Sequence, residues 1–102
     1  MIQAVLTVQN GLIKTARISG HSGSADKGED LICAAVSAIV FGTCNALDEL
    51  GSEADIEVSS NLVKITGRDD PLTQTILNTM DVQLRTVQEG RETFVNIRKT
   101  EV

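Results

Sequence analysis

Residues 2–19 read IQAVLTVQNGLIKTARIS, and this stretch decides how the chain begins to fold. One set of alternate positions from Ile2 to Val8 is entirely apolar, which is typical of a strand that buries one face. Asn10-Gly11 follows, and these two residues tolerate the positive φ angles of a type I′ turn. Leu12 to Ser19 then provides a second strand. The stretch therefore predicts an antiparallel hairpin.

Further strands are indicated in the second half of the chain. Between Asp55 and Gly67, two short apolar alternations flank Ser60-Asn61, a pair that favours a turn. Phe94 to Lys99 forms one more short alternating segment. We expect a second hairpin and a final strand from these patterns.

The segment from Glu29 to Leu50 is apolar on most faces, which predicts a central helix buried on several sides. Asp26 followed by Glu29 resembles a capping box at its start, and Gly51 is expected to stop it. A second helix is expected to begin at residues 69–71, Asp-Asp-Pro, because an acidic cap followed by proline is typical of a helix start. It is amphipathic and half exposed, and its apolar side is expected to comprise Leu72, Ile76, Met80, Leu84 and Val87.

The resulting order ββαββαβ predicts an α+β fold, with a mostly antiparallel sheet and both helices packed on one of its faces. With 102 residues, the chain is expected to form a single domain over residues 1–102. A domain of this size buries only about 60 to 70 % of its unfolded surface, so a dimer interface would be a natural supplement.

Charge restricts the partners. Nine basic and fourteen acidic residues give a net charge of −5, which disfavours binding to a phosphate backbone. Phe41 and Phe94 are the only aromatic residues, so a platform for stacking bases is missing. We expect no direct nucleic-acid binding and instead an affinity for basic partners.

The sequence starts Met-Ile-Gln-Ala, without a basic segment or a long apolar run, and no stretch reaches about 18 uninterrupted apolar residues. These features predict a cytoplasmic protein without a membrane segment. Its two cysteines are then expected to be reduced thiols.

Residues 20–33 read GHSGSADKGEDLIC and contain the only histidine and the first cysteine. The glycines and serines predict a functional loop that another backbone can approach closely. Cys33 falls in the first turn of the expected helix, where unpaired amides and the helix dipole favour a thiolate. For nucleophilic catalysis, His21 would accept the thiol proton, and amides at the helix start would hold an oxyanion.

Asp30 and Ser37 share a helical face with Cys33. Asp30 is expected to orient His21 or to accept hydrogen bonds from first-turn amides. Ser37 is expected to donate to the thiolate or substrate, or to its own helix backbone. Structural alternatives stay open on these observations, because cysteine is often a small buried apolar residue and a histidine in a glycine-rich turn is often solvated.

Other site chemistries find little support. One histidine and two cysteines without a C-x-x-C pair predict no zinc site. Cys33 and Cys44 are eleven residues apart on one expected helix, about 16 Å along its axis, which is beyond the reach of a disulfide. No phosphate-binding or dinucleotide-binding glycine motif occurs.

The segments ISGHSG at 18–23 and GEDLICAAVS at 28–37 resemble the signature of the ribosomal-processing cysteine protease family called Prp. Length, leading hairpin and downstream features agree, so the resemblance covers essentially the whole chain. It implies Cys33 as nucleophile and His21 as general base, with Asp30 and Ser37 in supporting roles. It also implies a substrate-covering loop that includes Gly20, Ser22 and Gly23. Ser22 departs from the alanine that is common in the family.

The resemblance further implies a bacterial cytoplasmic endopeptidase that removes the N-terminal extension of large-subunit ribosomal protein number twenty-seven. It implies a homodimer and no cofactor. Two other functions remain open. One is a non-enzymatic ribosome-assembly or peptide-binding module with an inert Cys33. The other is a redox sensor, which would need an intermolecular partner because Cys44 is out of reach.

Overall fold

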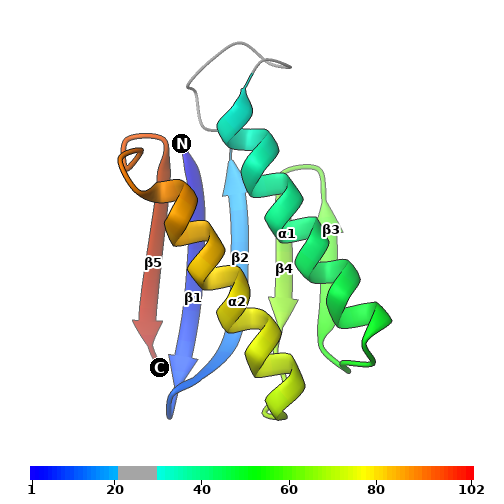
Figure 1. Cartoon of the computed structure of the whole chain (residues 1–102). Helices are drawn as coiled ribbons and strands as arrows, with labels where there is room; N and C mark the ends of the chain where they lie inside the picture. Colours follow the sequence, from blue (N-terminus) through cyan, green and yellow to red (C-terminus); the bar gives the residue numbers. More distant parts are fainter. Residues whose placement is uncertain (21–29) are drawn as a thin grey trace.

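The computed structural model describes residues 1–20 and 30–102, and these residues form five strands and two helices. The order ββαββαβ confirms the prediction (Figure 1). The elements are β1 (Ile2–Gln9), β2 (Leu12–Gly20), α1 (Leu31–Glu49), β3 (Asp55–Ser59), β4 (Leu62–Thr66), α2 (Pro71–Gln88) and β5 (Val95–Glu101).

The strands form one sheet in the order β3-β4-β2-β1-β5. The pairs β1–β2, β2–β4 and β3–β4 are antiparallel, whereas β1 and β5 run parallel. The expected, mostly antiparallel sheet is therefore confirmed, and it is more fully described as mixed. The parallel pair arises because α2 carries the chain from β4 back across the sheet before β5 begins, as parallel strands require a crossover connection.

The first hairpin forms as its sequence predicts. Asn10 and Gly11 have φ angles of 53° and 78°, the positive values that a type I′ turn needs. Leu6 of β1 pairs with Ala16 of β2, and both side chains are fully buried beneath the helices. The alternation in the sequence thus sets which face of the sheet lies against the core.

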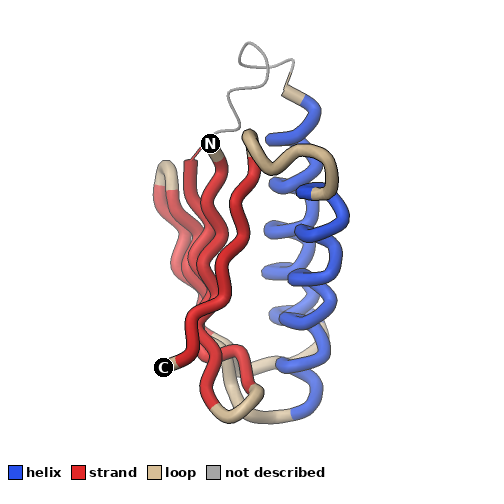
Figure 2. Tube along the Cα trace, turned by 90° about the vertical axis from the view of Figure 1, so that its left-hand side faces the viewer, coloured by secondary structure: helices blue, strands red, loops and turns tan. Residues whose placement is uncertain are grey.

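Both helices cover the same face of the sheet, and within residues 1–20 and 30–102 no element covers the other face (Figure 2). On α2 the buried stripe is shifted from the predicted one: Leu77 is fully buried, whereas Leu72 is 40 % exposed. The stripe also contains Asp81, whose carboxylate lies 2.8 Å from the ammonium group of Lys99 on β5. A buried carboxylate is tolerated there because this cation faces it.

The prediction that α1 is buried on several sides is wrong. Only one face of α1 packs into the core, through Val36, Val40, Thr43, Cys44 and Leu47. Leu31 is 82 % exposed, and Ala34 and Ala38 are also exposed. The reason is that the two helices lie side by side in one layer, so no other described element covers their outer faces (Figure 2). By length and composition alone, α1 is long and apolar enough to cross a membrane. Core helices of soluble proteins also meet this criterion.

The start of α1 also differs from the prediction. The helix begins at Leu31 with Asp30 as its N-cap, and the expected capping box of Asp26 and Glu29 lies outside the described residues. Asp30 is a good cap because its short carboxylate reaches the first unpaired amides. The end is as expected: Gly51, with φ of 87°, follows the last turn.

Candidate active site

Three parts of the fold meet at one end of the molecule: the first turns of α1, the end of β2, and the turn between β3 and β4 (Figure 1). A cavity of about 290 Å³ lies between them. Its lining includes Cys33 and Ser37 from α1 and Gly20 from β2. The fold therefore brings together three residues that the sequence analysis singled out.

Cys33 is the third residue of α1 and has a half-buried, reduced thiol. It is one of the residues that line the cavity. The residue that the sequence analysis expects to be the nucleophile thus lies at this cavity.

Asp30 fixes the backbone around Cys33. One carboxylate oxygen, Oδ1, accepts the N–H groups of Ile32 and Cys33, each at 3.0 Å. This is one of the two roles expected for Asp30. The N–H groups of Ile32 and Cys33 are thus directed at this carboxylate.

Ser37 follows Cys33 by one helical turn, is exposed and lines the same cavity. Gly20 ends β2 with φ of +89°, and a Cβ added there would lie 2.3 Å from the carbonyl oxygen of Met1. Only glycine fits this position without strain. The other expected site residues, His21, Ser22 and Gly23, lie outside the described residues.

The second cysteine has a different environment. Cys44 is buried on the core face of α1, and loss of hydration raises the pKa of its thiol above the ordinary value. Within residues 1–20 and 30–102, no group of three histidine, cysteine or carboxylate side chains is arranged to hold a metal ion.

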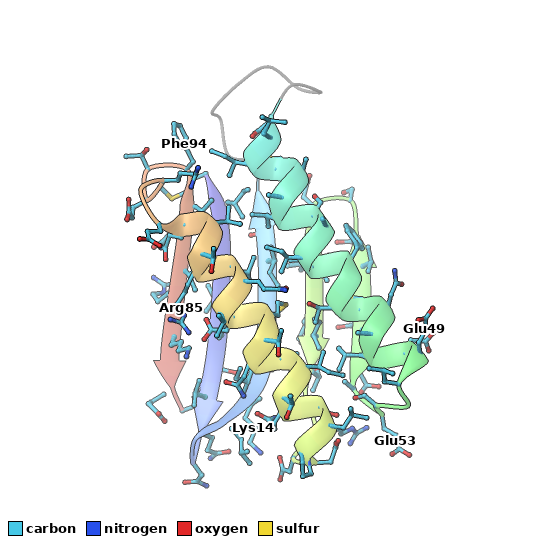
Figure 3. The ribbon with its side chains drawn as sticks, viewed as in Figure 1. Lys14, Glu49, Glu53, Arg85 and Phe94 are labelled. Atoms are coloured by element: carbon cyan, nitrogen blue, oxygen red, sulfur yellow. The ribbon has the colours of Figure 1, made fainter. Side chains whose placement is uncertain are left out.

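The charge is distributed unevenly. Glu49 and Glu53 lie at the end of α1 opposite its first turn (Figure 3). In contrast, none of the fourteen residues that line the cavity in the described part of the chain is Asp, Glu, Lys, Arg or His. The cavity is thus suited to uncharged groups.

Residues 1–96 match the protein family described as cysteine protease Prp. This chain belongs to the Prp family. The ribosomal processing cysteine protease Prp of Staphylococcus aureus is 34 % identical to it over 95 residues, which cover 87 % of this chain and 90 % of that protein. The chain is therefore a member of a family of cysteine proteases along nearly its full length.

Two solved structures of the S. aureus Prp protease share the fold. One, in complex with a covalently linked product peptide, has a TM-score of 0.92 and 30 % identity, and covers 98 % of this chain and 100 % of that one. The other, in complex with a substrate peptide, has a TM-score of 0.86 and 29 % identity, with the same coverage. The α+β architecture described above is thus the fold of Prp proteases.

The structure adds site residues that sequence reasoning missed. Phe41 of α1 and Ser60-Asn61 of the β3–β4 turn line the cavity with Cys33. The position of Phe41, eight residues after Cys33 on the same helical face, was a usable signal. Nothing local in the sequence connects the β3–β4 turn with the cysteine, because sheet pairing alone brings them together.

Proposed function

We propose that this chain is a cysteine endopeptidase that removes the N-terminal extension of large-subunit ribosomal protein number twenty-seven during bacterial ribosome maturation. The observation that carries the proposal is the Cys33 thiol at the first turn of α1, lining an open cavity, in a member of a cysteine protease family. The name of the S. aureus relative supports a ribosomal substrate.

In the proposed mechanism, His21 takes the proton from the Cys33 thiol, and the thiolate attacks the scissile carbonyl carbon. The C–N bond then breaks, and the protonated His21 returns the proton to the leaving amine. This leaves a thioester on Cys33, and water that gives its proton to His21 hydrolyses it. His21 directly follows Gly20, which lines the same cavity as Cys33.

Asp30 and Ser37 support this chemistry in different ways. Asp30 is a positioning residue, because its carboxylate holds the first turn of α1 by the two hydrogen bonds described above. Ser37 lines the cavity one helical turn after Cys33, and in this proposal its hydroxyl donates to the thiolate or the substrate. Gly20, Ser22 and Gly23 belong to the substrate-covering loop of this proposal.

We also propose that the enzyme is cytoplasmic, acts without a cofactor, and binds neither membranes nor nucleic acid directly. The net charge of −5 supports attraction of a basic ribosomal protein over binding to phosphate groups. A homodimer is supported by α1, which has no charged residue from Leu31 to Leu47 yet exposes Leu31, Ala34 and Ala38.

Cleavage of the extended ribosomal protein, followed by mass spectrometry, tests the proposed activity. We expect scission at a single bond by the unaltered enzyme, and none by Cys33→Ala, Cys33→Ser or His21→Ala. Cys44→Ala is the matched control, because Cys44 packs into the core on the same helix, and it should cleave normally. A protein that binds the substrate without cutting it would instead be the non-enzymatic peptide-binding module.

A further inference from the structure

One edge of the sheet is open among the described residues. The strand order β3-β4-β2-β1-β5 leaves β3 with β4 as its only neighbour in the sheet (Figure 1). Four of its five residues are exposed, and Ile56 is half-buried. A strand edge presents unpaired N–H and C=O groups to which a further strand can bind. The edge of β3 is therefore a surface that can pair with an extended chain.

The geometry of the hairpin shows which backbone groups are available. Ser60-Asn61 is a two-residue turn, closed by the pair Ser59 and Leu62. In such a hairpin the residues that close the turn direct their hydrogen-bonding groups at each other, and every second pair directs them outwards. The N–H and C=O groups of Ile56 and Val58 therefore point to the free edge.

The two sides of β3 offer different side chains beside this edge. Ile56 packs against the core, so Val58, two residues further, lies on the same helix-covered side of the sheet, where it is 57 % exposed. Glu57 lies on the opposite side and is exposed. Lys64 is opposite Glu57 on β4, yet Glu57 forms no ion pair with a described residue. An added strand would thus have an apolar neighbour on one side and a carboxylate on the other.

The charge around β3 favours a basic chain. Glu49 and Glu53 lie near the start of the strand (Figure 3), and Asp55 and Glu57 are within it. Arg68 offsets part of this charge, because its guanidinium group lies 3.8 Å from the carboxylate of Asp55. The remaining excess of carboxylates attracts lysine and arginine side chains.

The opposite edge of the sheet and a second copy of the chain both fit less well. At that edge β5 exposes Arg98 and Lys99, which would repel a basic segment. A second copy that paired through β3 would bring the carboxylates of the two copies together, and like charges across a strand pair are destabilising. The occupant that the charges favour at β3 is therefore a basic segment of another protein.

The strand β3 also leads to the cavity. Its last residue, Ser59, and the following Ser60 line the cavity that contains Cys33. At about 3.3 Å per residue, β3 is roughly 16 Å long. A segment bound along β3 therefore ends next to the cavity, which holds the rest of the same protein near the thiol.

We propose that the free edge of β3 is a docking site for an extended, basic segment of the substrate protein, which binds as a sixth strand and lies outside the residues held at the thiol. The inference rests on the proposed function and deepens it, because a segment remote from the cleaved bond then helps to select the substrate. Main-chain hydrogen bonds to Ile56 and Val58 supply affinity, and Glu57 favours a lysine or arginine beside it.

The test compares cleavage of the whole extended ribosomal protein with cleavage of a short peptide that contains only the residues next to the cleaved bond. Val58→Pro removes an outward N–H group, a change that an edge strand tolerates. It should raise KM for the whole protein by about 3- to 10-fold relative to KM for the short peptide, because one main-chain hydrogen bond is lost. Val58→Ala is the matched control: it keeps the N–H group and should retain most of the affinity for the whole protein.

Charge provides a second, independent variant. Glu57→Gln should raise KM for the whole protein by about 2- to 5-fold and weaken its dependence on salt, because an exposed ion pair with the substrate is lost. Glu101→Gln is the matched control, since it changes the net charge equally, but Glu101 is exposed on β5 at the opposite edge. It should leave KM for the whole protein unchanged.

The proposal is overturned if KM for the whole protein is the same in Val58→Pro and Glu57→Gln as in the unaltered enzyme, or if Glu101→Gln raises it as much as Glu57→Gln does. An oligomeric state that changes in Val58→Pro while KM stays the same, measured by sedimentation, would identify a second copy as the occupant and also overturn it.

Failure of the proposed function gives a different result, because the unaltered enzyme then cleaves neither substrate. Binding of the fluorescently labelled ribosomal protein to Cys33→Ala, measured by anisotropy, decides the docking site in that case. Weaker binding when Val58→Pro or Glu57→Gln is added supports the docking site, and equal binding refutes it.

Discussion

Removing the Asp30 cap should destabilise the protein and misplace Cys33. In Asp30→Ala the N–H groups of Ile32 and Cys33 lose the carboxylate oxygen that both contact at 3.0 Å. Loss of an N-cap costs about 0.5–2 kcal/mol, and each hydrogen bond contributes roughly 1 kcal/mol. Because two bonds are lost, we expect a decrease of about 1–2 kcal/mol in the free energy of unfolding.

Thermal and urea unfolding measure this change, which corresponds to a lower Tm by about 4–8 °C for each kcal/mol. Asp30→Asn should retain most of the stability, because asparagine caps helices about as well as aspartate. If the carboxylate acts through its hydrogen bonds, Asp30→Asn also retains most of the activity. The kcat of Asp30→Ala should fall by about 10- to 100-fold, since a displacement of roughly 1 Å at a reacting group has an effect of this size.

Asp70→Ala is the matched control. Asp70 caps α2 by accepting the N–H and the hydroxyl of Thr73, at 2.9 and 2.8 Å. The start of α2 lies at the opposite end of the molecule from the start of α1 (Figure 1). Asp70→Ala should therefore lower stability by a similar amount and leave kcat unchanged when both proteins are folded. The reasoning is refuted if Asp30→Ala melts like the unaltered protein, or if both variants lose activity equally.

Three other changes have predicted outcomes. Alkylation of the native protein should label Cys33 and spare Cys44, whose pKa is raised by burial, until the protein is unfolded; peptide mapping measures this. Gly20→Ala should lower the free energy of unfolding, measured with urea, by about 1–3 kcal/mol, because a side chain is strained at φ of +89° and its Cβ would meet the carbonyl oxygen of Met1. An unchanged free energy of unfolding would contradict this reasoning. Lys99→Ala should lower the free energy of unfolding by about 1–2 kcal/mol, because the buried Asp81 carboxylate loses the cation at 2.8 Å and keeps only Arg85 at 3.4 Å. A loss below about 0.5 kcal/mol in urea unfolding would contradict this role of Lys99.

The parts of the fold that depend on local sequence were predictable. Asn10-Gly11 specifies its turn through backbone preference, and Pro71 after Asp70 specifies the start of α2 in the same way. The parallel pairing of β5 with β1 was not predictable, because alternation within residues 94–99 says which side chains share a face and nothing about the neighbouring strand.

The exposure of α1 shows a second limit. The apolar sequence of α1 predicts that residues such as Leu31 are buried, yet the packing of the helices leaves Leu31 exposed to solvent. At the site, the four-residue spacing of Cys33 and Ser37 was enough to predict that both lie on one face of α1. The turn at Ser60-Asn61 joins them only through the register of β4 on β2 and the packing of α1 over the sheet, and neither is encoded locally.

The most direct measurement of the central claim is mass spectrometry of the enzyme quenched during turnover of the extended ribosomal protein. We predict a covalent adduct whose added mass equals that of the acyl fragment from the N-terminal side of the cleaved bond, mapped to the peptide that contains Cys33. Cleavage that continues in Cys33→Ala, or an adduct that maps to Cys44, would contradict the assignment of Cys33 as the nucleophile.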